Sequence, residues 1–267
     1  LFKSAAEVKV MAEAAEISAQ AHMEAMRICK PGLSEYHLES IILHTFANHG
    51  ARFTAYPSIV GGGDNACTLH YIENQSKLKA GDLVLIDAGC ELDCYASDIT
   101  RTFPVSGEFS LEQRSLYQIV LDAQYAAIKA VKPGNNWNHP HEAAVREITQ
   151  GLIHLELIDA ELDEAIEKEL YKPFFMHRTG HWLGLDVHDV GEYKIAGEWR
   201  LLEPGMVLTV EPGIYVSPSN KDVAKKWRGI GIRIEDDVLV TKSGCRVLTV
   251  SVPKEINGIE ALMAGDE

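Results

Sequence analysis

The chain has 267 residues, with 39 acidic and 25 basic side chains and a formal net charge of −14 at pH 7. This length allows one large domain or two small ones and a substantial buried core. The negative charge argues against a nucleic-acid partner, because such partners are bound mostly through Lys and Arg.

The five cysteines are an odd number without framework spacing, which predicts free thiols and a reducing compartment. Cys90 and Cys94 could suggest a zinc site. Without a second cysteine pair, two small packing residues are the favoured interpretation.

The sequence has no apolar run near the ~20 residues of a membrane span, and its first residues lack the layout of a secretion signal. We therefore expect a soluble, cytoplasmic protein without membrane contacts. The chain begins at Leu1 and not at Met, which suggests that an upstream piece has been removed or left out.

Two helices are predicted at the start of the chain. Ser4 and Glu7 form a capping box, and apolar residues follow at helical spacing until Lys-Pro-Gly at residues 30–32. Ser34 then caps a second helix, which we place at residues 35–48.

Strand-like segments follow at residues 56–60, 67–71 and 83–89, and residues 95–103 are expected to form the hairpin partner of the last. The glycine run 61–63 could suggest a phosphate loop. It lacks the Lys-Ser/Thr that binds phosphate and magnesium, so a flexible turn is favoured.

The next part of the chain repeats this plan. Ser110 and Gln113 form another capping box, a second Lys-Pro-Gly stands at residues 132–134, and Pro140 suits the first turn of a following helix. The acid-rich segment 156–172 predicts a solvated helix and loop. Further strands are expected at residues 206–211, 214–216, 230–240 and 246–250, before a short helix at 256–263.

One strand pattern occurs twice. Residues 83–89 read Leu-Val-Leu-Ile-Asp-Ala-Gly and residues 207–213 read Val-Leu-Thr-Val-Glu-Pro-Gly, so Asp87 and Glu211 hold equivalent places. The apolar runs predict buried strands, and a carboxylate at the end of such a strand must be paired, hydrogen-bonded or bound to a metal. We expect the two copies to pack about a pseudo-twofold axis, with both acids near it.

Three more residues complete a candidate metal site. Asp98 follows Asp87 at a separation that a hairpin can turn into adjacency, Glu235 lies late in a predicted strand, and His181 stands in a glycine-flanked segment. Four carboxylates and one imidazole suit Mn²⁺, with Co²⁺, Zn²⁺ or Fe²⁺ as alternatives. Four negative charges match two divalent ions.

The motifs that carry these residues closely resemble those of the pita-bread metallopeptidases, and within that family those of the Xaa-Pro aminopeptidases. The resemblance covers essentially the whole chain. It is carried by Ile-Asp-Ala-Gly at 86–89, Ser-Asp-Ile-Thr-Arg at 97–101, Gly-His-Trp-Leu-Gly at 180–184, Val-Glu-Pro-Gly at 210–213 and Arg-Ile-Glu-Asp at 233–236.

The resemblance implies an α+β pita-bread fold with a curved, mainly antiparallel sheet covered by helices. Residues 1–267 would be a single catalytic domain of two related halves, roughly 1–107 and 108–267. The N-terminal domain common in Xaa-Pro aminopeptidases has no counterpart here, so the chain is expected to be an isolated catalytic domain or a shorter member.

The resemblance also implies a dinuclear site, with Asp87 on one metal, His181 and Glu211 toward the other, and Asp98 and Glu235 bridging. We expect a metal-bound hydroxide to attack the peptide bond before proline, with Glu211 as the proton acceptor.

Three histidines recur in the resemblance. His188 is expected to donate a proton to the departing nitrogen and His70 a hydrogen bond to the oxyanion. We place His177 with Arg233 in the pocket wall. The family usually has a glycine where this chain has Arg178, which could narrow the mouth of the site or give it a charge.

The expected partners are peptides with proline at the second position, and the protein could also form a homo-oligomer. Prolidase and methionine aminopeptidase activities stay open as alternatives. A pita-bread domain that has lost catalysis and binds a protein or nucleic acid is the third alternative.

Overall fold

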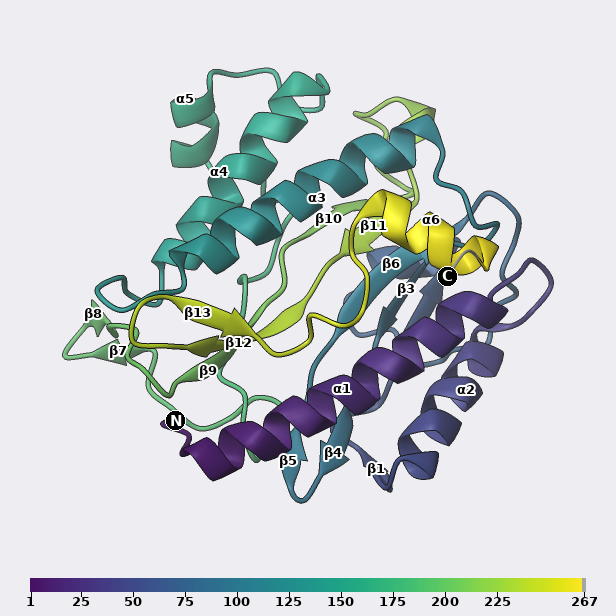
Figure 1. The fold of residues 1–267 in the computed structure, drawn as a ribbon. Helices are drawn as coiled ribbons and strands as arrows, with labels where there is room; N and C mark the ends of the chain where they lie inside the picture. Colours follow the sequence, from purple (N-terminus) through teal and green to yellow (C-terminus); the bar gives the residue numbers. More distant parts are fainter. Residues whose placement is uncertain (266–267) are drawn as a thin grey trace.

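The computed structural model describes residues 1–265. Its helices cover the outside of a group of strands, with α1 beside α2 and α3 beside α4 (Figure 1). Within the described residues the helices are α1 (Ala5–Ile28), α2 (Glu35–Asn48), α3 (Leu111–Ala130), α4 (His139–His154), α5 (Leu162–Glu167) and α6 (Ile256–Ala264), with the 3₁₀ turns η1 (Gly63–Cys67) and η2 (Lys225–Trp227).

The strands form small sheets, and every strand pairing described in residues 1–265 is antiparallel. This confirms the predicted α+β class. The strands are β1 (Phe53–Thr54), β2 (Ile59–Gly62), β3 (Leu83–Asp87), β4 (Cys90–Leu92), β5 (Tyr95–Ala96), β6 (Thr100–Pro104), β7 (Lys194–Ile195), β8 (Glu198–Trp199), β9 (Val207–Val210), β10 (Gly213–Val216), β11 (Ile230–Arg233), β12 (Asp236–Val240) and β13 (Cys245–Val247).

The helix boundaries agree closely with the sequence patterns. The backbone N–H of Glu7 donates to Ser4 Oγ at 3.4 Å and Ser4 N–H donates to Glu7 Oε2 at 2.7 Å, which is the predicted capping box of α1. Ser110 and Gln113 make the same pair of bonds at the start of α3. The second helix has the predicted ends.

The central sheet near the acids has the order β2-β3-β6, with Asp87 of β3 opposite Ile59 on one side and Thr100 on the other. All four side chains Leu83 to Ile86 are buried, as the apolar run predicts. Asp87 therefore stands at the end of a strand that is paired on both edges.

Three strand predictions before residue 105 were wrong in detail. Strand β2 starts at Ile59, so Tyr56 precedes it, and the predicted strand 95–103 is divided into β5 and β6. Residues 67–71 form the end of η1 and a turn. The flexible turn predicted for 61–63 was also wrong, because Gly61 and Gly62 belong to β2 and Gly63 begins η1. A Cβ at Gly61 would lie 3.0 Å from the Asn65 backbone, so glycine permits this close approach.

The predicted strand 230–240 is broken between Arg233 and Asp236. Strand β11 pairs with β10, whereas β12 pairs with β9 and β13. The break occurs where Glu235 N–H donates to Thr100 O at 3.0 Å, across from the first part of the chain. Glu235 is thereby placed at a kink between two sheets.

The acid-rich segment contains the short helix α5 with largely exposed residues around it, as predicted. All five cysteines are free, as predicted; Cys90 is buried in β4 and Cys94 is exposed. Among the described residues, each helix is too short or too polar to cross a membrane. The division into halves at about residue 107 stays a prediction.

Candidate active site

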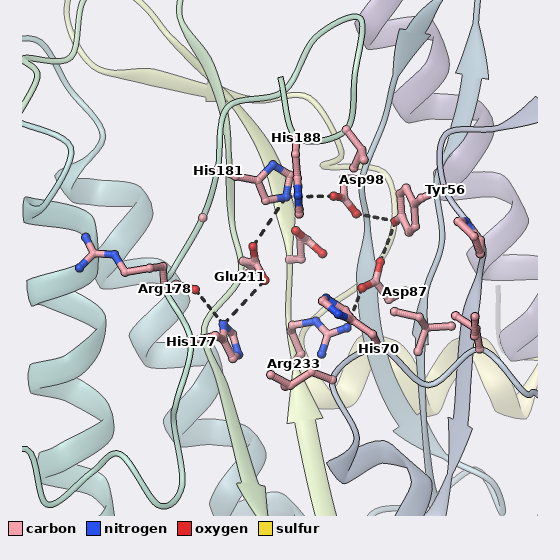
Figure 2. Close-up of a pocket in the computed structure, with 17 residues that line it drawn as sticks. Tyr56, His70, Asp87, Asp98, His177, Arg178, His181, His188, Glu211 and Arg233 are labelled. Atoms are coloured by element: carbon pink, nitrogen blue, oxygen red, sulfur yellow. Dashed lines mark hydrogen bonds and ion pairs between the residues drawn. The ribbon is translucent and has the colours of Figure 1, made fainter. Parts of the chain in front are cut away.

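One cavity of about 510 Å³ contains every residue that the sequence proposed for the site (Figure 2). Its wall combines charged groups with apolar side chains. The proposed residues in its lining are Asp87, Asp98, Glu211, Glu235, His70, His177, His181, His188 and Arg233.

The four acids reach the cavity from strand ends and strand breaks. Asp87 ends β3, Glu211 follows β9, and Glu235 lies at the kink between β11 and β12. Asp98 lies between β5 and β6, where Ala88 N–H donates to Ile99 O at 3.0 Å and keeps the two segments together. Backbone hydrogen bonds thus hold acids from distant parts of the chain in one place.

Asp87 and Asp98 share a tyrosine. The hydroxyl of Tyr56 lies 2.7 Å from Asp87 Oδ1 and is also hydrogen-bonded to Asp98 Oδ1. Figure 2 shows Tyr56 pointing between the two carboxyl groups. The tyrosine therefore fixes the orientation of one oxygen of each acid.

Arg233 does more than line the pocket wall. Its Nη2 lies 2.6 Å from Asp87 Oδ2 in an ion pair whose side chains are 4% and 13% exposed. The guanidinium also donates to the Tyr215 hydroxyl at 2.9 Å and to Thr100 Oγ1 at 3.2 Å. Thr100 in turn donates to Glu235 Oε2 at 2.6 Å. One arginine thus joins two of the proposed metal ligands.

His181 faces the acids through its Nε2 atom, which lies 3.3 Å from Asp98 Oδ2 and 3.7 Å from Glu211 Oε1. Its Nδ1 donates to Trp182 O at 2.9 Å, which directs Nε2 toward the cavity. Gly180 allows this placement, because a Cβ there would lie 2.1 Å from Thr209 O.

His177 is held in a chain of hydrogen bonds. Its Nδ1 donates to Arg178 O at 2.7 Å, and its Nε2 lies 2.9 Å from the Tyr215 hydroxyl that Arg233 also contacts. Burial and the nearby charge of Arg233 lower the pKa of His177 to about 4. The imidazole is therefore neutral and its remaining nitrogen accepts from Tyr215.

The other two histidines, His70 and His188, are both exposed in the lining of the cavity. The ring of His188 packs against His181, with the centroids 4.3 Å apart, and burial together with the charge of His181 lowers its pKa. His70 is exposed and projects into the cavity from the loop after η1 (Figure 2).

Burial makes this group of acids difficult to ionise together. Burial and the charge of Asp87 raise the pKa of Asp98, and burial with repulsion from Asp98 and Glu211 raises that of Glu235 well above its usual value. Burial raises the pKa of Glu211 to about 7. Bound cations would offset this repulsion.

The residues fit a metal centre. One ligand atom each of Asp98, His181 and Glu235 lie within 4.8 Å of one another, and these are oxygen and imidazole donors. Glu211 stands beside His181, and Asp87 is joined to Asp98 through Tyr56. The donor set thus suits hard or borderline divalent cations.

Arg178 lines the cavity, and its effect on the charge or width of the mouth stays a prediction. Its guanidinium donates to Asn138 Oδ1 at 2.6 Å and lies over the Trp199 ring at 5.0 Å from the centroid. Figure 2 shows the side chain directed away from the acids. A cation–π contact and a hydrogen bond outside the metal cluster explain this direction.

Sequence reasoning missed three hydroxyl groups of the site: Tyr56 and Thr100, which contact the acids, and Tyr215, which contacts Arg233 and His177. Each acts through a hydroxyl, and a hydroxyl near an acid cannot be recognised from spacing alone. Thr100 stands inside the Ser-Asp-Ile-Thr-Arg motif, so its position was the one available signal.

A model of metallopeptidase family M24 matches residues 9–242. The chain belongs to this family. The match covers both strands that end in Asp87 and Glu211, as well as Asp98, His181 and Glu235. It therefore supports the pita-bread fold predicted from the sequence.

Individual M24 proteins are similar over almost all of this chain. The Xaa-Pro aminopeptidases of Haemophilus influenzae and Escherichia coli are 52% and 51% identical over 263 residues, which are 98% of this chain but 61% and 59% of those proteins. The chain thus spans about 60% of the length of these relatives.

Solved structures confirm the fold. The Pseudomonas aeruginosa aminopeptidase PepP is 62% identical and superposes with a TM-score of 0.99 over 100% of this chain and 60% of that one. A zinc-substituted E. coli aminopeptidase P in complex with product is 50% identical, with a TM-score of 0.97 over 100% of this chain and 60% of that chain.

Proposed function

We propose that this chain carries the catalytic site of an Xaa-Pro aminopeptidase, which hydrolyses the bond between an N-terminal residue and proline. The observation that carries the proposal is the convergence of four acids and His181 in one cavity with His70, His177 and His188. The names of the similar proteins support the same reaction.

Two divalent cations would be held by Asp87, Asp98, His181, Glu211 and Glu235, with Asp98 and Glu235 between them. When bound, such cations activate water and stabilise negative charge on a carbonyl oxygen. Manganese is the proposed metal, and cobalt, zinc or iron would also suit these donors. The zinc-substituted relative supports a site that accepts more than one of these metals.

Glu211 is the proposed proton acceptor. Its carboxylate lies in the cavity beside His181, within reach of the position that the attacking water would occupy between the proposed ligands. It would take a proton from the attacking water and return it when the peptide bond breaks.

The histidines would donate a proton and hydrogen bonds to the substrate and shape the cavity wall. His188 stands next to His181 and would donate a proton to the departing nitrogen, and His70 would donate a hydrogen bond to the carbonyl oxygen. His177 and Arg233 would shape the wall, since Tyr215 joins them on one side of the cavity.

Recognition of proline must rely on shape, because its nitrogen carries no hydrogen to donate. Five apolar side chains belong to the cavity lining, and we propose that they select proline through the shape of its pyrrolidine ring. They are Pro57, Ile59, Leu69, Ile72 and Val187.

A peptide panel tests the proposed reaction. With Mn²⁺ supplied, we expect Xaa-Pro-Yaa tripeptides to be hydrolysed with a higher kcat/KM than Xaa-Pro dipeptides and Met-Ala-Yaa peptides. Preference for the dipeptides would indicate a prolidase, and preference for Met-Ala-Yaa a methionine aminopeptidase. No hydrolysis of any peptide by protein that binds Mn²⁺ would favour a non-catalytic binding domain.

We also propose peptides with proline at the second position as partners, a cytoplasmic location and a homo-oligomer. The acidic charge of −14 supports peptides over nucleic acid as partners. Size-exclusion chromatography with light scattering would test the assembly, and a monomer at micromolar concentration would contradict it.

A further inference from the structure

His70 is carried by a segment whose shape is not set by a sheet. We call residues 63–78 the His70 loop; it begins with η1 and continues mainly through turns and irregular backbone. Within the described residues, His70 itself makes no side-chain hydrogen bond and is exposed. Its position in the cavity must therefore come from the contacts that fix the loop on either side.

A single buried carboxylate fastens both ends of this loop. Glu35 of α2 is 0% exposed. Its Oε1 accepts from Gly62 N at 2.8 Å and Asn65 Nδ2 at 2.9 Å, before His70 in the chain. Its Oε2 accepts from the Tyr71 hydroxyl at 2.9 Å and Ser76 N at 2.7 Å, after His70.

Asn74 provides a second anchor on the strand beside the acids. Its side-chain oxygen accepts from Val60 N–H at 2.9 Å and its amide donates to Ser58 O at 2.9 Å, so it continues the hydrogen bonding of the free edge of β2. The residue is 1% exposed and has a φ of +48°, a conformation that asparagine tolerates. Strand β2 pairs with the strand that ends in Asp87.

Apolar contacts also hold the His70 loop, but they fix its backbone position less precisely than hydrogen bonds do. Leu69 and Tyr71 pack against a small cluster formed by Ile59, Leu85 and Tyr215. Such contacts favour burial without fixing a precise backbone position. The oriented hydrogen bonds of Glu35 and Asn74 supply that position.

We propose that Glu35, assisted by Asn74, is a positioning residue that places His70 over the reaction site. The proposal rests on the function of His70 proposed above. Glu35 does not line the cavity, so it would act only through the loop. A group that donates to an oxyanion loses most of its effect when it is displaced by about 1 Å.

The test uses Glu35→Gln, which keeps the size of the side chain but replaces one accepting oxygen with an NH₂ donor. That NH₂ would face two donors at one end of the loop. We expect kcat for an Xaa-Pro-Yaa peptide to fall about 10- to 100-fold, with an unchanged number of bound Mn²⁺ ions. Glu73→Gln is the matched control, because Glu73 is exposed in the same loop.

A double-mutant cycle with His70→Ala decides how Glu35 acts. If Glu35 works through His70, the double variant is no slower than His70→Ala alone. Independent, multiplying losses would contradict the positioning role. Full activity of Glu35→Gln together with reduced activity of His70→Ala would also contradict the positioning role of Glu35. That result would still support the proposed function of His70.

Full activity of His70→Ala would overturn both the proposed function of His70 and the positioning role of Glu35. Cleavage of Xaa-Pro-Yaa peptides would still support the proposed reaction.

If Glu35→Gln does not fold, Asn74→Gly provides the same test. Glycine retains the positive-φ backbone and removes both bonds to β2. The same fall in kcat is expected, and its absence would contradict the proposal.

Discussion

At the scale of single residues, Tyr56 orients two of the proposed metal ligands. Its hydroxyl contacts one carboxyl oxygen of Asp87 and one of Asp98, and a phenol carries a single proton to share between them. Burial and the charge of Asp87 raise the pKa of Asp98. Bound cations would favour the ionised form of both acids.

Replacing Tyr56 with Phe is expected to weaken Mn²⁺ binding or activity about 10- to 100-fold, since groups that orient metal ligands typically contribute this much. Isothermal titration calorimetry would measure the affinity. Tyr95→Phe is the control, because the Tyr95 hydroxyl also bonds a carboxylate, that of Glu7 at 2.7 Å, but lies outside the cavity. Equal affinities in the two variants would contradict an orienting role for Tyr56.

At the scale of elements, helix α1 supports the strand that ends in Asp87. His22 is fully buried on this helix, and its Nε2 lies 2.9 Å from Ala88 O, directly after β3. A carbonyl only accepts, so Nε2 carries a proton and donates to Ala88 O. Burial lowers the pKa of His22 to about 4, so the ring is neutral at pH 7.

This buried histidine predicts a loss of stability in acid. The unfolded chain binds a proton near pH 6.5, and the folded chain only near pH 4. The contribution of His22 is therefore complete above pH 6.5 and is lost as the pH falls toward 4, by about 3 kcal/mol. In His22→Gln, the unfolding free energy should fall by about 3 kcal/mol less than in the parent protein between pH 6.5 and pH 4.

Urea unfolding at several pH values would measure this difference. His44→Gln is the control, because His44 is exposed on the neighbouring helix α2. If His22→Gln retains the full pH dependence of the parent protein, the account of His22 is wrong.

Most helices and the main strands could be predicted because their signals are local. The capping boxes at Ser4 and Ser110 and the apolar run before Asp87 depend only on nearby residues. The His70 loop and the break before Glu235 could not be predicted. Both are set by bonds to residues far away in sequence, from Glu35 in the first case and Thr100 in the second.

At the scale of the whole molecule, a buried charge network joins distant parts of the chain behind the acids. Arg101 donates to Glu235 O at 2.6 Å and pairs with Asp236 at 2.8 Å, in side chains that are 0% and 1% exposed. Lys254 pairs with the same aspartate at 2.6 Å. Although burial alone would raise the pKa of Asp236, these cations lower it.

This network explains why the acids converge although their strands belong to separate sheets. Removing one partner of a buried ion pair leaves an uncompensated charge and is strongly destabilising. The pair at Arg101 therefore fixes the backbone of Glu235 relative to the segment that carries Asp98.

The convergence of Asp87 and Glu211 on one cavity could be predicted from the sequence because their strands end in an acid at equivalent places. The side chains that contact the acids could not. Tyr56 and Arg233 show the difference: the first lay in a segment read only as a strand, and the second was assigned to the wall although it pairs with Asp87. Such pairings depend on side-chain directions that periodicity does not contain.

The central claim is that the buried acids form a functional site for two cations. The most direct test is to remove metal with a chelator and follow hydrolysis of an Xaa-Pro-Yaa peptide while Mn²⁺ is added back. We predict activity that saturates at two ions per chain, and Asp98→Asn that binds fewer ions and is inactive. Full activity of the metal-free protein, or of Asp98→Asn, would contradict the account.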